Sequence, residues 1–441
     1  MGSNASRSSV ILSVVAAVSV LTSTQSAPAG ARTSPSLLDG DLVILGDPDF
    51  GMEGGIRTVR SFGRLAFLYD EELRRLIPQN EERAPVRALG TLGRLVKLVL
   101  VDSFFVQLEF GVTHEVFGHG ARGRENGLNP SFRFSLPYPY RWVLDAKVDH
   151  GAVTLVEGHT GVLERDLLFF SGGIEANHFG AWLLQTEFLI PRRRAHYSEA
   201  LLYLVSNLYY SDSAFFGLEN RSSDSDNDVQ SYVTGLQERF NQWRDRDRSR
   251  VENRLKIAWL WIFADPTLWL SFWHVIVDYA FLGERWMNFP MLKLDAFRFF
   301  PGTRFNSSPF GAEHYLDLFM LKDDLLFDLY GRVGSSGLAS YWGAGIRAFG
   351  YKPGFGLELG GELDVWNQPE ILFEQRNVFF RPNTWGASTA VHATWMFYCP
   401  IGITGKLGAK TQGYLMGQPV DGGVYGYVGL SLFTDETSLF H

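Results

Sequence analysis

The chain has 441 residues, of which 46% are apolar and 15% aromatic, and its formal charge at pH 7 is −8. That apolar share is enough for the core of one large domain or of about two to three smaller ones. The negative charge argues against nucleic acid as a partner. The single cysteine, Cys399, cannot form an intrachain disulfide.

The first 29 residues have the layout of a secretory signal peptide. A short, weakly basic segment, residues 1–7, precedes an apolar run from Val10 to Leu21, and small residues follow up to Ala29. The run is short for a bilayer span, so the pattern favours cleavage near Ala29 over a membrane anchor.

Residues 36–82 give a mixed pattern, in which 47–55 reads as a loop rich in Gly and Asp and 65–76 as a short helix. The segment from Leu92 to Val112 predicts a longer helix that is apolar around most of its surface, as a helix buried in a protein core is. Asp102 and Glu109 interrupt the segment, which disfavours a membrane span.

Two histidines and a carboxylate follow directly, in the run Thr-His-Glu-Val-Phe-Gly-His-Gly at 113–120. On a regular helix, His114 and His119, five positions apart, would point about 140° away from each other. They can share one ion only if a π-bulge accommodates an extra residue, and Gly118 lies where such a bulge would form. The spacing therefore predicts a π-helical turn and a metal site.

This motif resembles that of the dipeptidyl peptidase III family, zinc peptidases of the gluzincin type. A gluzincin takes its third ligand from a glutamate on a later helix, and Glu175, in a Glu-Ala-Asn run, resembles that residue. The resemblance implies that His114, His119 and Glu175 bind Zn²⁺, with the fourth position open for water. It also implies that Glu115 is the general base in the cleavage of a peptide or protein substrate.

Other interpretations of these residues stay open. Glu115 and His119 are four apart, so they could form an ordinary pair on a helix surface. Glu175 and His178 have the Glu-x-x-His spacing of di-iron carboxylate bundles, although the sequence holds no second such run. A peptidase also needs a hydrogen-bond donor that stabilises the negative charge of its transition state. The candidates nearby in the sequence are His159, His178 and Arg122.

After the motif the sequence predicts two β-like pieces, at 132–142 and 147–157, which could be a sheet edge that binds substrate or an ordinary hairpin. The pattern from 167 to 281 is helical. Asp265-Pro266 divides the most membrane-like stretch, 257–282, into two helices that are each short for a span. The predicted helices cover 179–190, 197–210, 229–243 and 251–263.

From about Met287 apolar and polar residues alternate, which is typical of strands with one apolar face. Strands of this kind with aromatic residues near their ends fit a barrel of the bacterial outer membrane. A lipocalin-like barrel would show the same period with its apolar face inward. The signal peptide, the aromatic share and the 46 glycines favour the outer membrane, although residues 434–441 continue past the last strand. The eight candidate strands lie near 292–299, 316–320, 325–333, 342–348, 355–365, 391–397, 401–409 and 424–432.

The sequence thus predicts an α+β protein: a signal peptide (1–29), a mainly helical, zincin-like part (30–285) and an antiparallel β-barrel of about eight strands (286–441). The expected function is that of a Zn²⁺-dependent metallopeptidase at or near a bacterial outer membrane, with a peptide or protein as substrate and outer-membrane lipid as a second partner. One alternative is a non-catalytic outer-membrane barrel whose helical part binds a ligand or partner. Another is an intramembrane zinc protease of the inner membrane, and a periplasmic location is also open.

Overall fold

The computed structural model describes most of the chain between 42 and 432, and the expected signal peptide, residues 1–29, lies outside the described residues. The described ranges are 42–47, 51–64, 66–77, 83–137, 139–140, 152–156, 163–190, 194–211, 228–241, 248–335, 340–371, 382–398 and 401–432.

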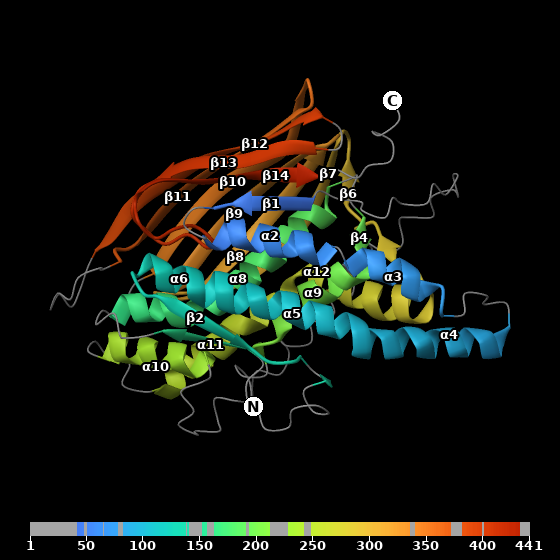
Figure 1. The fold of residues 1–441 in the computed structure, drawn as a ribbon. Coiled ribbons are helices and arrows are strands. Elements are labelled where there is room, and N and C mark those ends of the chain that lie inside the picture. The colour runs from blue at the N-terminus through green and yellow to red at the C-terminus, as the bar shows by residue number, and fades with distance from the viewer. Residues whose placement is uncertain are drawn as a thin grey trace, which may run out of the picture.

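The fold is α+β, as predicted, with helices in the first part of the chain and strands in the last (Figure 1). The predicted helix at 92–112 lies within one continuous run from Ala84 to Glu125, in which α-helical and π-helical segments alternate. The helices are α2 (Met52–Arg64), α3 (Ala66–Arg74), α4 (Ala84–Lys97), η1 (Leu98–Asp102), α5 (Ser103–His114), η2 (Glu115–His119), α6 (Gly120–Glu125), α8 (Leu163–Phe188), α9 (Tyr197–Leu208), α10 (Asp228–Asn241), α11 (Arg248–Trp259), η4 (Leu260–Ala264), α12 (Pro266–Trp273) and η5 (His274–Phe281).

A large antiparallel sheet covers one side of these helices (Figure 1). Its order is β1-β14-β13-β12-β11-β10-β9-β8-β7-β6, so nine neighbouring strands follow one another along the chain and β1, from the start of the described chain, extends the sheet beside β14. The strands are β1 (Leu42–Gly46), β6 (Leu292–Leu294), β7 (Phe297–Ser308), β8 (Gly311–Lys322), β9 (Leu325–Ser335), β10 (Ser340–Gly354), β11 (Leu357–Pro369), β12 (Asn383–Tyr398), β13 (Ile401–Lys410) and β14 (Gly423–Leu432).

The expected closed barrel is wrong for the described residues. β1 and β6 stand at opposite ends of the sheet and do not pair with each other, so the sheet is open. The helices occupy the side that would be the lumen of a barrel (Figure 1). A two-residue period indicates only that the two faces of a strand differ in polarity. The period is the same in an open sheet and in a closed barrel, so it could not predict closure.

Two small antiparallel pairs complete the described strands: β2 (Pro130–Phe134) with β3 (Ala152–Val156), and β4 (Ala195–His196) with β5 (Trp286–Met287). β3 lies within the predicted β-like piece 147–157, whereas β2 overlaps the predicted piece 132–142 only at 132–134.

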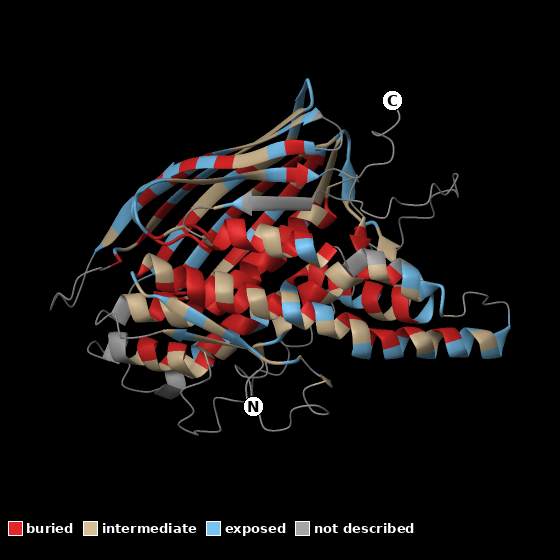
Figure 2. Ribbon diagram, in the orientation of Figure 1, coloured by how far each residue is buried: buried red, intermediate tan, exposed pale blue. Residues whose placement is uncertain are grey.

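The two faces of the large sheet have inverted polarity. Along β8 the buried positions include Glu313, Tyr315 and Asp317, whereas Leu316 and Leu318 between and beyond them are 60% and 42% exposed. The same alternation of buried and exposed residues is visible along neighbouring strands (Figure 2). We call the face toward the helices the inner face and the opposite face the outer face. The outer face carries these large side chains: Leu316, Leu318, Val333, Trp342, Ile346, Leu363, Val365, Trp385, Val391, Trp395, Ile403, Leu407, Val428 and Leu430.

Charges on the inner face are paired with one another or with helix residues. Arg304 binds Asp317 through two hydrogen bonds of 2.5 and 2.8 Å, and Arg332 donates to Glu313 over 2.7 Å. Lys406 of β13 reaches Glu53 of α2 over 2.6 Å. The first two pairs join neighbouring strands, and the third holds α2 on the sheet, since unpaired buried charges are costly.

No single described helix has both the length and the apolar composition needed to cross a bilayer, whereas the consecutive segments Val251–Ala264 and Pro266–Phe281, bent by 61°, meet both criteria as a pair. The bend falls at Asp265-Pro266, where the sequence predicted a break. Pro266 occupies the start of α12, where its missing N–H leaves no hydrogen bond unmade.

The helical layer is tightest where η2 crosses α8. A Cβ atom added at Gly118 would lie 2.5 Å from the Cα of Gly173 and 2.7 Å from the carbonyl oxygen of Gly172. One added at Gly173 would lie 2.2 Å from the imidazole of His114. Only glycine allows the two backbones to approach this closely, and the approach sets the position of both predicted metal-binding histidines.

We expect Gly118→Ala to destabilise the protein by about 1–3 kcal/mol, because the new methyl group would meet backbone atoms that cannot rotate away. The measurement is the midpoint of thermal or denaturant unfolding. Gly111→Ala, in α5, is the matched control, since its nearest neighbour would be 3.8 Å away. That substitution should be neutral or stabilising by about 0.5–1 kcal/mol. Equal effects of the two substitutions would contradict the close crossing.

Candidate metal centre

The π-helical turn predicted from the histidine spacing is confirmed: η2 is a π-helix that covers Glu115–His119. Its extra residue rotates His119 toward His114, which ends the preceding α-helix. The Nε2 atoms of the two imidazoles are 3.1 Å apart. Both histidines are buried, with 2% and 4% of their surface exposed.

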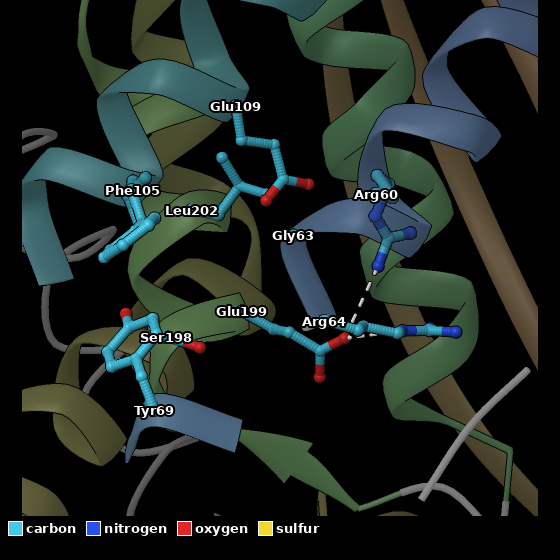
Figure 3. Close-up of a pocket in the computed structure, with 10 residues that line it drawn as sticks. Arg60, Gly63, Arg64, Tyr69, Phe105, Glu109, Ser198, Glu199 and Leu202 are labelled. Atoms are coloured by element: carbon cyan, nitrogen blue, oxygen red, sulfur yellow. Dashed lines mark hydrogen bonds and ion pairs between the residues drawn. The ribbon is translucent and has the colours of Figure 1, made fainter. Parts of the chain in front are cut away.

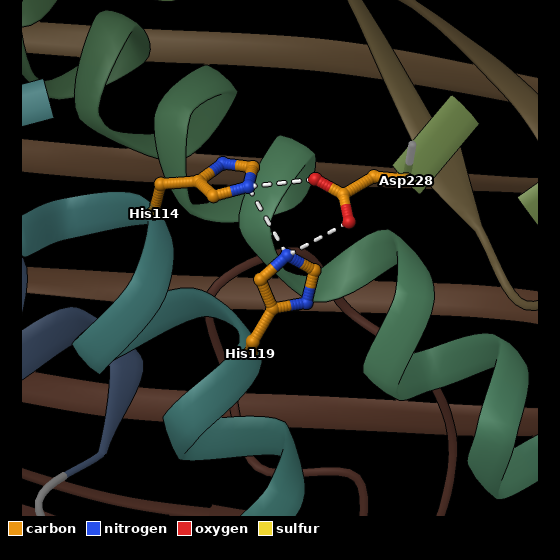
Figure 4. Close-up of side chains that lie close together, drawn as sticks. All are labelled: His114, His119 and Asp228. Atoms are coloured by element: carbon orange, nitrogen blue, oxygen red, sulfur yellow. Dashed lines mark hydrogen bonds and ion pairs between the residues drawn. The ribbon is translucent and has the colours of Figure 1, made fainter. Parts of the chain in front are cut away.

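The third member of the group is Asp228, the first residue of α10 (Figure 4). One carboxylate oxygen lies 2.8 Å from Nε2 of His114, and the other lies 3.3 Å from Nε2 of His119. The structure thus brings together a buried His-His-Asp group that could hold a metal ion. No motif in the sequence pointed to Asp228, which follows His119 by more than a hundred residues.

Glu175, the expected third ligand, lies elsewhere in the helical layer. Its carboxylate accepts hydrogen bonds from Nε and Nη2 of Arg122, the first over 3.0 Å, and from the backbone N–H of Gly417 over 2.8 Å. The face of α8 toward the histidines carries Gly173 and Asn177 instead. Glu175 is two residues from each, so it points about 200° around the helix from them.

Hydrogen bonds on the far side of each imidazole leave Nε2 available as a ligand. Nδ1 of His119 lies 2.6 Å from the carbonyl oxygen of Phe169, so Nδ1 carries the proton. Nδ1 of His114 faces the Asn177 amide at 2.9 Å, while Oδ1 of that amide is buried without a partner. Rotating the Asn177 amide by 180° exchanges its oxygen and nitrogen without changing the shape of the side chain. In that orientation Oδ1 accepts a hydrogen bond from Nδ1–H of His114.

The donor set fits zinc. Tetrahedral zinc with ligand bonds of about 2.0–2.2 Å holds its ligand atoms about 3.3–3.6 Å apart, close to the separations of 3.1, 2.8 and 3.3 Å here. Two histidines and one carboxylate are also the ligands of many iron(II) oxygenases. Glu115, adjacent to a ligand, favours hydrolysis because such a reaction needs a general base beside the metal.

Charge within the group is complementary. Burial lowers the pKa of His119, but Asp228 outweighs burial and raises it to about 9. Conversely, burial raises the pKa of the Asp228 carboxyl, and the two histidines outweigh it and hold the pKa far below its usual range. The carboxylate is therefore charged at neutral pH, whereas His119 carries a proton on Nε2 that a bound metal ion would have to displace.

Two further side chains complete the surroundings of the group. The Tyr210 hydroxyl lies 2.8 Å from Nε2 of His114 and donates to Asp228 over 3.1 Å. Burial and the Asp228 charge raise the pKa of Tyr210 well above its ordinary value, so the hydroxyl keeps its proton. Glu115 is buried, and its Oε2 accepts a 2.6 Å hydrogen bond from Thr154 of β3. The sequence gave no sign of Tyr210 or Thr154.

The sequence offered three side chains that could stabilise the negative charge of a transition state. The two that the structure describes lie apart from the His-His-Asp group. His178 is buried among Trp259 and Phe305, and burial lowers its pKa to about 3. Arg122 is engaged by Glu175 and Glu125. His159 lies outside the described residues.

A second group of potential ligands, Glu53, Glu362 and His392, lies between α2 and the sheet. The Lys406 ammonium is 2.6 Å from Glu53 and 2.9 Å from Glu362. Because a cation of the chain itself already occupies the space between these carboxylates, we interpret the group as an ion-pair network.

Another charged cluster surrounds a cavity of about 20 Å³ between α2, α5 and α9 (Figure 3). Arg60 and Arg64 of α2 pair there with Glu199 of α9 and with Glu187 of α8. Glu109 lines the same cavity, and burial raises the pKa of its carboxyl to about 8 despite the nearby arginines. Two arginines thus face three glutamates, of which Glu109 keeps its proton at neutral pH.

Comparison with known proteins adds no assignment: no protein-family model matches the chain, and no curated protein or solved structure matches it. The similarity to gluzincins is confined to short motifs, and the geometry of the His-His-Asp group carries the argument.

We expect one zinc ion per chain in the wild-type protein, measured by mass spectrometry of metals after dialysis. Asp228→Ala should lose the metal as His114→Ala does, because each removes one of three ligands. Glu175→Gln should keep the metal in its folded fraction, although it should lower stability because the fully buried Arg122 would keep only Glu125 as a charged partner.

The double variant Arg122→Met with Glu175→Met removes both fully buried charges and leaves only the partly exposed Glu125 without its arginine, so it should recover stability and bind zinc normally. The opposite result would be a double variant that is folded but free of zinc, together with an Asp228→Ala variant that retains zinc. That result would identify Glu175, and not Asp228, as the third ligand.

We also expect Glu109 to make the protein less stable as pH rises. In the folded protein the pKa of Glu109 is about 8, whereas in the unfolded chain it lies near 4.5. Stability is therefore lost as pH rises through this window. Glu109→Gln should raise the melting temperature relative to wild type more at pH 8.5 than at pH 5. An equal difference at both values would refute this role for the carboxyl.

Proposed function

We propose that the protein is a zinc-dependent hydrolase of peptide bonds that works at or near a bacterial outer membrane. The observation that carries the proposal is the convergence of His114, His119 and Asp228, with a buried glutamate next in sequence to the first ligand. Two histidines, one carboxylate and a neighbouring glutamate are the groups that zinc peptidases use.

In this proposal the metal-binding residues and Glu115 have different roles in hydrolysis. Zinc, when bound by His114, His119 and Asp228, supplies a Lewis acid that polarises a carbonyl and makes water acidic enough to attack near neutral pH. Glu115 accepts the proton of the attacking water and later gives it to the leaving amine. The hydrogen bond from Thr154 holds one oxygen of Glu115 in place and leaves the other for the proton.

Tyr210 is the hydroxyl donor closest to the ligands among the described residues. With its pKa raised by burial it remains neutral at every physiological pH. In this position it can donate a hydrogen bond to the oxygen on which negative charge develops as the carbonyl is attacked. That role fills the need for which the sequence offered only His159, His178 and Arg122.

The β2–β3 pair is a candidate platform for the substrate. Within the described residues β3 pairs only with β2, so its other edge is available. Thr154 of β3 contacts Glu115 of η2, which places that strand beside the proposed base. An extended peptide added to β3 would run past the metal centre, a binding mode common among peptidases.

We expect Glu115→Gln to keep one zinc per chain and to lower kcat by about 10²–10⁴-fold, because it removes the base without removing a ligand. The measurement pairs zinc content with cleavage of a pooled library of fluorescence-quenched peptides. Glu125→Gln, a change to a glutamate of α6 that contacts Arg122 and none of the metal ligands, is the control and should retain turnover.

Two outcomes would refute the peptidase. One is unchanged turnover by Glu115→Gln. The other is a zinc-loaded wild-type protein that cleaves nothing in the library, which would favour a helical part that binds a ligand or partner without catalysis.

A further inference from the structure

We propose that the outer face of the sheet is seated in the hydrocarbon of a lipid bilayer, with the helices and the metal centre on the side of the sheet turned away from the acyl chains. The outer face comprises the fourteen large side chains named above, from Leu316 to Leu430. This inference is independent of the proposed hydrolysis.

The extent of the outer face argues that it does not face water. Its large side chains are between 38% and 69% exposed. Together they leave on the order of 1,000 Å² of apolar surface, whereas the largest patch on a typical soluble monomer covers only about 300–600 Å². A surface of this size needs an occupant.

The distribution of charge across the sheet points to lipid as that occupant. Away from the strand ends, the outer-face positions of β8 to β14 carry no Asp, Glu, Lys or Arg. Charged residues of these strands lie on the inner face, where Arg347, for example, is 3.4 Å from Asp328 and 3.5 Å from Asp364. Apolar residues outside and paired charges inside are the arrangement of strands in an outer membrane, and the reverse of a soluble sheet.

The height of the apolar surface matches a bilayer. Trp342 and Trp385 meet edge to face at one end of it, with ring centroids 5.2 Å apart. Trp395 and Phe397 lie at the other end, 5.9 Å apart. Ten residues of β12 separate Trp385 from Trp395, which is about 33 Å along the strand. With a tilt of about 40° this becomes about 25 Å, the height of the apolar band between the aromatic girdles of outer-membrane proteins.

Helices contact the sheet near both of its ends, where bare strand edges would be costly in hydrocarbon. α2 contacts β1, and at the other end, where the three-residue edge strand β6 pairs with β7 only at 297–299, η4 and α12 contact β7. There the indole N–H of Trp261 donates to the carbonyl of Tyr315 in β8 over 2.9 Å, and Thr303 of β7 donates to the carbonyl of Trp261 over 3.2 Å. A second copy of the chain could also cover an apolar face, but it would not require aromatic residues in rows about one bilayer apart.

The test uses the full-length protein, moved from detergent into phosphatidylcholine vesicles and separated by flotation. Val391→Arg combined with Leu407→Arg places two charges on facing residues of β12 and β13 in the middle of the outer face. Both side chains are already exposed, by 57% and 67%, so the variant should fold, as circular dichroism will show. The matched control is Leu76→Arg with Leu89→Arg, two exposed leucines of the helical part.

We expect wild type and the control to float with the vesicles, and the outer-face variant to lose about tenfold or more of its bound fraction. Lipids brominated along their acyl chains should quench tryptophan fluorescence in wild type and not in the outer-face variant.

Three results would overturn the inference. The first is a wild-type protein that stays in the aqueous fraction. The second is an outer-face variant that binds as well as the control. The third is a wild-type dimer in detergent-free buffer that this variant converts to monomer, which would assign the face to a second copy. None of them bears on zinc content or on turnover by Glu115, which are measured separately.

Discussion

The close crossing of η2 and α8 is the constraint on which the metal centre depends. Gly118 meets Gly172 and Gly173 with no side chain between the backbones, and the space that a Cβ at Gly173 would fill holds the imidazole of His114. The π-helical turn then supplies the rotation that brings His119 to the same point. A regular α-helix at this crossing would separate the imidazoles, and a larger residue at either glycine would separate the helices.

A buried ion pair between α6, which continues from η2, and α8 connects these helices to the segment between β13 and β14. Arg122 and Glu175 are fully buried and bind each other through two hydrogen bonds. The segment 411–422 between β13 and β14 completes the pair, since Gly417 donates to Glu175 and the carbonyl of Gln418 accepts from Arg122. Glu175 thus has a structural partner for each of its oxygens, which explains why a carboxylate close to the histidines in sequence does not reach them.

The inverted polarity of the sheet places charges where helices can use them. Lys406 links β13 to α2 through Glu53, and Trp182 of α8 donates to Asp328 of β9 over 3.1 Å. Buried pairs of this kind contribute little net stability, yet losing one partner is strongly destabilising. Because each partner would be costly to leave unpaired, these contacts favour the observed arrangement of helices on the sheet, while large apolar residues such as Leu316 and Leu407 lie on the outer face.

The sequence by itself determined the local features of this protein. The five-residue spacing of His114 and His119, with Gly118 between them, predicted a π-helical turn on the premise that both histidines share one ion, and the two-residue period beyond Met287 predicted strands with one apolar face. Strand β7 was largely missed because helices cover it, so its residues from Gly302 to Ser308 are buried on both faces and do not alternate. The tertiary structure alone decided that the sheet stays open over the described residues, that its apolar face points outward, and that Asp228 lies with His114 and His119 in a group that could hold a metal ion. Each of these depends on contacts between residues far apart in the chain, for which local periodicity and spacing carry no signal.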